Sequence, residues 1–199
     1  MSGAFPISTA QFESLGIKSI QNTIISKSVS GKKLARQIDG QRWGFTARII
    51  TAKRSDVYGQ LMAFIIKQRS GKENFTIVPP EVEDARGTAS GTPTGTASAG
   101  ATSITLGGTG TGTLKAGDFI KFDNHSKVYM VVADQSDIST GTLTIEPPLT
   151  TAVSSSDIQY DDVPFTVYLT NDIQEFGVVG AGQDGTLLYQ FEFDVEEAL

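Results

Sequence analysis

The clearest pattern of hydrophobic and polar positions in this chain runs from Gln41 to Pro80. In its first part, every second residue suits a buried face, which is the period of a strand with one side in a core. The residues on the expected inner side are Trp43, Phe45, Ala47, Ile49 and Thr51. The pattern therefore predicts a strand over residues 41–52.

A helix is predicted directly after this strand, over about residues 55–70. Ser55 offers a hydroxyl to the free N–H groups of a helix start, and Asp56 would lie at the positive end of the helix dipole. Gly71 supplies a stop, because glycine readily adopts the positive φ that often ends a helix. The residues at the spacing of one helical face are Val57, Leu61, Phe64, Ile65 and Gln68. We expect this face to lie across a sheet.

Three further segments complete the expected sheet. Asn74–Val78 is predicted as a strand that ends at the following two prolines, because proline cannot donate to a ladder. Near the C-terminus, Val163–Thr170 and residues 187–195 alternate in the same way, and the last has an acidic outer face. The segment between them, Asp172–Asp184, is expected to be a loop. The N-terminal part alone would be short of strands, so we expect these C-terminal strands to complete its sheet.

The N-terminal region carries weaker signals. Residues 1–21 contain apolar residues without a clean period, so we expect an arm that needs a partner surface. Asn22–Val29 and Leu34–Ile38 favour short strands. The Asp39-Gly40 pair favours a tight turn, because both residues tolerate positive φ. It predicts that residues 34–38 pair with residues 41–50.

The middle of the chain differs in composition. Residues 87–112 are rich in Gly, Thr, Ala and Ser, which is typical of a linker, with one short strand at 102–106. The strands that follow are Asp118–Asp123, Lys127–Ala133 and Thr142–Glu146, with Ile158–Tyr160 closing the set. We expect a small β-barrel. The chain is thus predicted to be mainly β, with one domain of residues 1–86 and 163–199 split by an inserted module of residues 87–162.

Composition narrows the class of protein. The chain has 199 residues, of which 39% are hydrophobic, enough for a sizeable core. Its net charge is −6 and its basic residues are scattered, which argues against specific nucleic-acid binding. No apolar run approaches the roughly 18 residues that span a bilayer, and no signal peptide is evident, so we expect a soluble protein without membrane insertion. The absence of cysteine excludes disulfides, thiolate catalysis and cysteine metal sites.

Motifs for catalysis, cofactor binding or metal binding are missing. His125 is the single histidine, and its place between Asn124 and Ser126 is typical of a solvated turn, so we expect neither a catalytic triad nor a histidine metal cluster. Glycines at positions 108, 110, 112 and 117 resemble a phosphate loop, but no Gly-Lys-Ser/Thr ending and no predicted helix follow them. We therefore expect no catalytic residue, no cofactor and no metal.

Acidic residues gather in three places. They are Glu81, Glu83 and Asp84; Asp161 and Asp162; and Asp194, Glu196 and Glu197. Paired catalytic carboxylates need a shared cleft, which spacing alone does not indicate. A calcium loop needs acids at alternating positions around a glycine, and no run has that form. We expect these acids to be solvated and Trp43 to be part of the core.

The order of motifs between residues 40 and 80 resembles the core of tailed-phage minor tail proteins. The segments that carry the likeness are Gly40-Gln41-Arg42-Trp43-Gly44-Phe45-Thr46, Phe64-Ile65-Ile66-Lys67-Gln68-Arg69-Ser70-Gly71, and Glu73-Asn74-Phe75-Thr76-Ile77-Val78-Pro79-Pro80. The lambda-type minor tail protein and the distal tail proteins of long-tailed phages share this order: a strand, a helix ending in a glycine turn, and an aromatic-bearing strand into Pro-Pro.

A second likeness covers the middle segment. Lys115-Ala116-Gly117-Asp118-Phe119-Ile120, followed by residues 127–132 and 143–149, is similar to a small β module that recurs in phage tail proteins. The insertion departs from the lambda-type minor tail protein, which passes almost directly from Pro-Pro to the last strand.

The two likenesses imply a tail-tube-like β-barrel or sandwich with one short α-helix, and a structural role without catalysis. They imply a homo-oligomer, a hexameric ring at the distal end of the tail, which joins the tail tube protein to baseplate hub or tail tip proteins. The protein would be made in the host bacterial cytoplasm and reside in the virion. The strands at 41–52 and 187–195 are suitable for edge-to-edge addition between copies.

Two other functions stay open at this point. In one, the inserted module is a receptor- or glycan-binding module that acts in host adsorption. Its candidate contacts are Tyr129, Tyr160, Asp123 and Asn124. In the other, a wall-degrading hydrolase uses the C-terminal acids Glu192 and Glu196.

Overall fold

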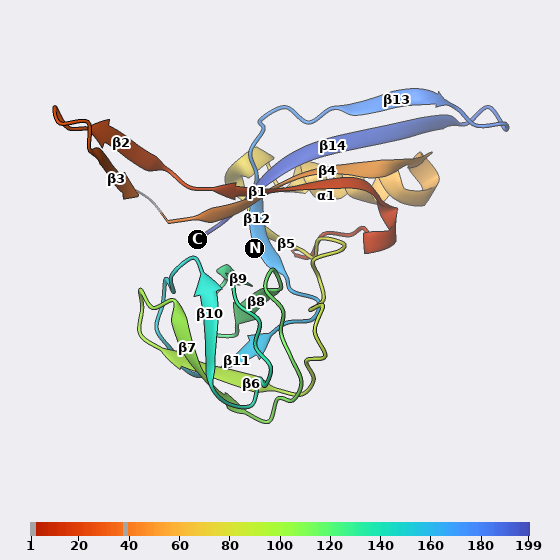
Figure 1. The fold of residues 1–199 in the computed structure, drawn as a ribbon. Coiled ribbons are helices and arrows are strands. Elements are labelled where there is room, and N and C mark those ends of the chain that lie inside the picture. Colours follow the sequence, from red (N-terminus) through yellow and green to blue (C-terminus); the bar gives the residue numbers. More distant parts are fainter. Residues whose placement is uncertain (1–2, 38–39) are drawn as a thin grey trace.

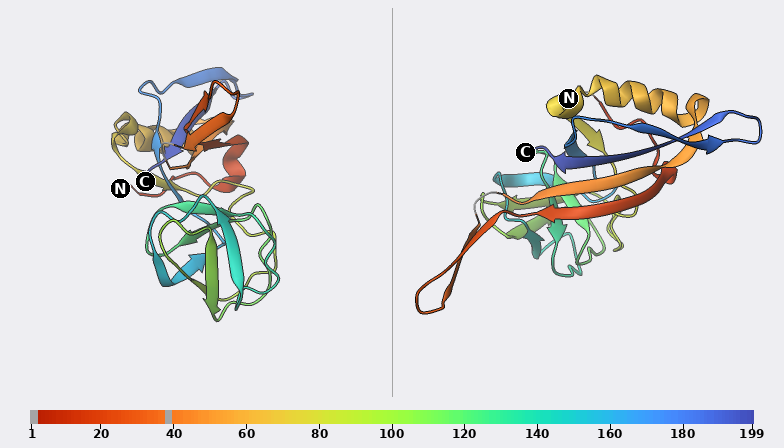
Figure 2. Two further views of the ribbon diagram at one scale, coloured as in Figure 1. Left: turned by 60° about the vertical axis from the view of Figure 1, so that its left-hand side comes forward. Right: turned by 90° about the horizontal axis from the view of Figure 1, so that it is seen from above.

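The protein is described here by a computed structural model that covers residues 3–37 and 40–199 (Figure 1). It is mainly β, as predicted, with one α-helix and a closed barrel of six strands. The barrel lies beneath an open sheet, and the helix runs along that sheet (Figures 1 and 2). No helix in the described part of the chain is long and apolar enough to cross a membrane.

The open sheet contains the long strands. They are β1 (Phe12–Ile20), β4 (Arg42–Lys53), β5 (Phe75–Ile77), β12 (Phe165–Leu169), β13 (Phe176–Ala181) and β14 (Leu187–Glu197). The order is β1-β4-β14-β12-β5, with β13 also paired to β14. Antiparallel register places Phe45 opposite Val195 and Ala47 opposite Phe193, so the apolar sides of β4 and β14 coincide. The expected completion of the sheet by C-terminal strands is confirmed.

The predicted inner face of β4 is largely correct. Trp43, Phe45, Ala47 and Ile49 are buried. Thr51 is exposed, where a register shift in β14 interrupts the pairing with β4. The main core therefore lies over the first two thirds of β4.

The predicted helix is confirmed, although it starts differently. A π-helical turn at Arg54–Tyr58 leads into α1 (Gly59–Lys67), and the predicted inner face is buried at Val57, Leu61 and Ile65. Ser55 lies within the first turn, where its hydroxyl donates to Asp56 Oδ1 (2.8 Å). Its expected role as a helix cap is wrong, because the side chain bonds its neighbour instead of the free N–H groups.

The end of the helix also differs from the prediction. Positive φ falls on Arg69 (54°) and Ser70 (61°), not on Gly71. Short 3₁₀ turns occur at Ser70–Lys72 and, near the N-terminus, at Thr9–Gln11. Gly71 is needed for close approach, since a Cβ there would lie 2.6 Å from the carbonyl oxygen of Leu169 on β12.

Three expectations about the outer strands are wrong. Residues 34–37 do not pair with β4, because β3 (Lys33–Gln37) pairs with β2 (Thr23–Lys27) in a separate hairpin, and Ile38 lies outside the described residues. The neighbour of β4 is β1, from the region that was expected to be an arm, and the expected loop 172–184 contains β13. These strands lie at edges or project outward, so they are too exposed to show strict alternation. The expected turn residue Asp39 lies outside the described residues.

The barrel is built from the middle of the chain. Its strands are β6 (Pro93–Ala97), β7 (Ser103–Gly108), β8 (Phe119–Phe122), β9 (Val128–Val131), β10 (Thr142–Glu146) and β11 (Val153–Gln159). They close in the order β10-β7-β6-β11-β8-β9. The segment expected to be a linker instead forms β6, β7 and their connections. The small residues of this segment permit tight packing, because a Cβ at Gly95 would lie 2.6 Å from the ring of Phe122.

All barrel strands fall between residues 93 and 159, whereas the strands of the open sheet lie before and after them. We propose two structural units on this basis, residues 87–162 for the barrel and residues 1–86 with 163–199 for the sheet and helix.

Candidate assembly surfaces and the barrel junction

A buried ion pair joins the barrel to the open sheet. Lys127, just before β9, contacts the carboxylate of Glu197 at the end of β14, and their side chains are only 2% and 0% exposed. Lys127 Nζ also donates to Gln41 Oε1 (2.9 Å). The expectation that Glu197 is solvated is wrong, because the barrel covers the end of its strand.

The carboxylate of Glu197 is held by backbone donors as well. The Val128 N–H donates to Glu197 Oε1 (2.8 Å), and the Trp43 N–H donates to Glu197 Oε2 (3.1 Å). The indole N–H of Trp43 donates to Val128 O (2.9 Å). The indole ring also packs edge-on against Phe119 of the barrel, with 5.0 Å between the ring centroids. Trp43 is therefore a core residue, as expected, and it lies at the junction of both units.

Burial dominates the electrostatics of this pair. It lowers the pKa of Lys127 and raises the pKa of Glu197, in each case against the partner's opposing attraction. Such a pair fixes geometry more than it adds stability, because taking two charges out of water offsets most of their attraction. The junction is thus a buried polar connection between the barrel and β4–β14.

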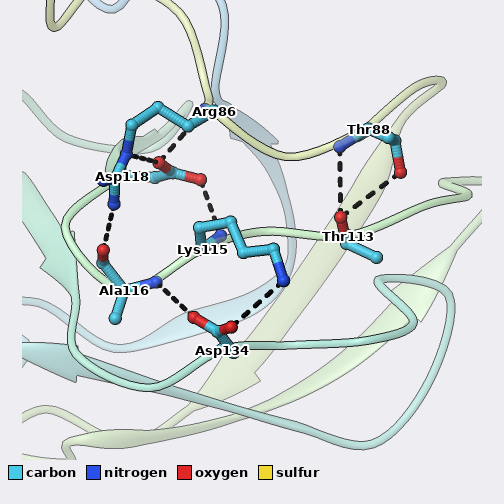
Figure 3. Close-up of polar contacts among 7 residues, drawn as sticks. All are labelled: Arg86, Thr88, Thr113, Lys115, Ala116, Asp118 and Asp134. Atoms are coloured by element: carbon cyan, nitrogen blue, oxygen red, sulfur yellow. Dashed lines mark hydrogen bonds and ion pairs between the residues drawn. The ribbon is translucent and has the colours of Figure 1, made fainter.

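A second polar cluster holds the chain where it enters the barrel (Figure 3). The buried carboxylate of Asp118 accepts from the Arg86 N–H (3.1 Å), Arg86 Nε (3.1 Å) and the Lys115 N–H (2.7 Å). Asp134 accepts from the Ala116 N–H (2.9 Å) and Lys115 Nζ (3.1 Å), and these bonds lower its pKa. The Lys-Ala-Gly-Asp motif therefore ties the entering segment to β8.

Two of the three acidic groups come together in space. The Asp162 N–H donates to Asp84 Oδ1 (3.2 Å), which connects residues 81–84 to residues 161–162. Burial raises the pKa of Glu83, and repulsion from Asp84, Asp162 and Glu81 raises it further. We call residues Glu81, Glu83, Asp84, Asp161 and Asp162 the acidic cluster. Four of its members are exposed, as expected for solvated acids, and Glu83 is half-buried.

His125 has a structural place in the barrel. Its Nδ1 lies 2.6 Å from Asn124 Oδ1, its Nε2 lies 2.8 Å from the Tyr129 hydroxyl, and its ring stacks on Phe122. Burial lowers its pKa. The expected solvated histidine is therefore half-buried, because the ring packs on the end of the barrel core.

The four candidate sugar contacts differ in exposure: the two tyrosines are buried, whereas the other two residues are exposed. Tyr129 is fully buried and Tyr160 is 6% exposed, with its hydroxyl donating to Gly91 O (2.8 Å). Their expected exposure is wrong, because both rings fill the barrel interior. Asp123 and Asn124 remain exposed.

The remaining candidate acids do not form a catalytic pair. Glu192 is exposed, whereas Glu196 accepts from the Tyr168 hydroxyl (2.8 Å). Four residues of strand separate them, roughly 13 Å at about 3.3 Å per residue, which exceeds the spacing of paired glycosidase carboxylates. Across residues 3–37 and 40–199, no group of three or more His, Cys, Asp or Glu side chains is arranged to hold a metal. The glycines at 108–117 lead into β8 and not into a helix.

The edges of the open sheet differ in how they are covered. The N-terminal segment covers β5, where the Phe5 N–H donates to Thr76 O (2.7 Å) and the Thr76 N–H donates to Gly3 O (3.1 Å). Among the described residues, β1 pairs only with β4 and β13 only with β14. Two edges, on opposite sides of the sheet, are therefore open to strand addition.

The β2–β3 hairpin, here called the arm (residues 23–37), projects away from the sheet and the barrel (Figures 1 and 2). Every residue of both its strands is exposed. The large apolar side chains of the two strands are Ile24, Ile25 and Leu34, and Val29 lies in the turn between them. The sequence signal for this hairpin is present, since Asn22–Val29 and Leu34–Ile38 both favour short strands.

These features describe a β protein with an open sheet, a projecting arm and a barrel that is joined to the sheet through a buried ion pair. A family model described as distal tail protein pb9, B domain, matches residues 82–161. The barrel is therefore similar to a distal tail protein B domain, and the match supports assignment of the chain to the phage distal tail proteins. No curated protein matches the chain.

Proposed function

We propose that this chain is the subunit of a ring at the distal end of a bacteriophage tail, where it joins the tail tube to the baseplate hub or tail tip. The role is structural and involves no catalysis. The tail tube protein and the hub or tip proteins are its neighbours, and the virion is its final location. The ring is hexameric in this proposal.

The observation that carries the proposal is a barrel that matches a distal tail protein B domain and is joined by a buried ion pair to a sheet with two open edges. Because β1 and β13 lie on opposite sides of β4 and β14, one copy can offer β13 to the β1 edge of the next. Such a contact is heterologous, and a heterologous contact forms a closed ring when its rotation closes. The backbone hydrogen bonds of added strands would supply much of the affinity.

The edge residues fit this use. Val178 and Val179 on β13 are 51% and 53% exposed. Exposed apolar side chains on an open edge favour association, because a neighbouring strand covers both the side chains and the free backbone groups.

Mass photometry and light scattering of the purified chain test the proposal. We expect a concentration-dependent closed species of six copies, visible as rings by negative-stain microscopy. Immunogold labelling should place the protein at the distal end of the tail in virions. A monomer at all concentrations, together with no label on virions, would overturn the proposal.

A receptor- or glycan-binding role gains no support from the barrel. Burial of Tyr129 and Tyr160 removes the aromatic surface on which a sugar ring would stack. Removal of the barrel would not test adsorption alone, since its Lys127 and Phe119 contact Glu197 and Trp43 of the sheet. The ring proposal therefore stands without a second candidate.

A further inference from the structure

The arm lacks a binding surface within its own chain. All ten residues of its two strands are exposed, and Val29 in the turn is exposed as well. Isolated two-stranded hairpins are marginal in water, and exposed Ile and Leu side chains make solvent contact unfavourable. A partner that covers the hairpin would stabilise it.

The arm also has an uneven charge. Residues 23–37 contain Lys27, Lys32, Lys33 and Arg36 and no acid, although the whole chain has a net charge of −6. The body of the protein is therefore more acidic than the chain as a whole. The acidic body of a second copy is therefore a partner of complementary charge for the basic arm.

A groove of about 340 Å³ lies at the other end of β1. Its apolar walls include Phe12, Leu15 and Ile17 from the open edge strand and Val82 from the loop after β5. Glu81 also lines it, as does Glu13, whose carboxylate pairs with Arg48 (3.4 Å). Glu81 belongs to the acidic cluster, which continues from this groove toward the barrel. The groove thus combines apolar walls with an excess of negative charge.

The arm lies away from the groove of its own copy. The groove extends along β1 as far as Ile17 and the arm begins at Thr23, six residues later, which is roughly 20 Å of extended chain. The arm then points away from the body, as the two views in Figures 1 and 2 agree. Contact between these surfaces therefore requires two copies.

We propose that the arm of one copy docks in the groove beside β1 of the next copy. The inference rests on the proposed ring and names one of its contacts. Ile24, Ile25 and Leu34 of the arm cover the apolar walls, while its lysines and Arg36 face Glu81 and the rest of the acidic cluster. Each copy has both an arm and a groove, so each copy docks its arm on one neighbour and receives the arm of another.

Two variants separate the partners of this contact. The arm variant carries Ile24→Asp and Lys33→Glu, and the groove variant carries Ile17→Lys and Glu81→Lys. All four positions are exposed, and circular dichroism checks that each variant is folded. Lys72→Glu, an exposed site on the turn after α1, is the matched control. Each variant alone should lose the ring, and the control should keep it.

Mixing the two variants gives the decisive result. The groove variant retains an intact arm, and the arm variant retains an intact groove. One arm–groove contact can therefore form between the two variants. No third copy can be added through such a contact, because the remaining arm and the remaining groove both carry substitutions. Light scattering should report a one-to-one dimer and no larger species. A photoreactive amino acid at position 25 should label residues 9–17 or 80–82 of another copy, as read by mass spectrometry.

The outcomes distinguish this contact from the ring itself. If both variants still form rings, or if the label falls elsewhere, the arm does not dock in this groove although the ring proposal survives. If the unmodified chain never associates, the ring proposal fails and this contact fails with it. Dimers only in the mixture, with the expected label, support both.

Discussion

Glu197 shows how one residue can be misjudged from sequence. Near-terminal acids are usually solvated, yet Glu197 is buried against Lys127. The signal was present, because Glu197 continues the inward positions of the last strand after Phe193 and Val195, and Lys127 is in phase with the buried Tyr129. Two opposite charges on inward positions indicate a buried pair.

Breaking this pair should destabilise the protein strongly. Lys127→Met alone leaves a buried carboxylate without its counter-charge and should cost about 3–5 kcal/mol. Adding Glu197→Gln removes that charge while keeping an acceptor for the N–H groups of Val128 and Trp43. The double variant should therefore recover much of the loss. Urea unfolding of the unmodified protein, the two single variants and the double variant measures the coupling energy between the two residues. Strictly additive changes in the free energy of unfolding would show that the two residues do not interact.

Glu83 should give the protein a pH-dependent stability term. Its pKa in the folded state is raised above the ordinary 4.5 by burial and by neighbouring carboxylates. The associated stability is therefore fully present below the unfolded pKa and lost as pH rises through the folded pKa. At neutral pH, Glu83→Gln should be more stable than the unmodified protein, and the difference should vanish as pH falls toward 4.5.

Urea unfolding at several pH values measures this difference. Glu146→Gln, an exposed acid on β10 outside the acidic cluster, is the control. An advantage of Glu83→Gln that persists unchanged below pH 4.5 would mean that its cause is not the titration of this carboxylate.

At the scale of elements, sequence predicts best where one face is buried. The helix and strands β4, β5, β12 and β14 follow from clear periods, because each lies against the main core. Strands β1 and β13 were missed because edge strands bury little, so their side chains need not alternate. The Gly- and Thr-rich wall of the barrel was missed for another reason: its residues are small because Phe122 and Ile104 lie against Gly95.

The helix offers a direct test of the predicted face. Leu61 is fully buried, whereas Ile66 on the same helix is 69% exposed. Leu61→Ala should destabilise the protein by about 2–5 kcal/mol, because it leaves a cavity under the helix. Ile66→Ala should change stability by less than about 0.5 kcal/mol. Equal effects of the two substitutions in urea unfolding would mean that the helix does not bury this face.

At the scale of the whole molecule, the junction decides whether barrel and sheet behave as one. Phe119 and Val128 of the barrel belong to the same buried cluster as Phe45 and Phe165 of the sheet. The barrel thus completes the core of the other unit as well as its own. The family match over residues 82–161 therefore covers a part whose side chains also pack into the core of the rest.

Trp43 can report this coupling, because it is the single tryptophan and lies at the junction. If the units separate only on global unfolding, its fluorescence and far-UV circular dichroism should follow one transition in urea. In Glu197→Ala the junction loses its central acceptor, so the fluorescence change should precede the loss of secondary structure. Separate transitions in the unmodified protein would instead mean that barrel and sheet are joined loosely. A loose junction could not transmit a fixed geometry from a tail tube to a tip, so this measurement also bears on the proposed role.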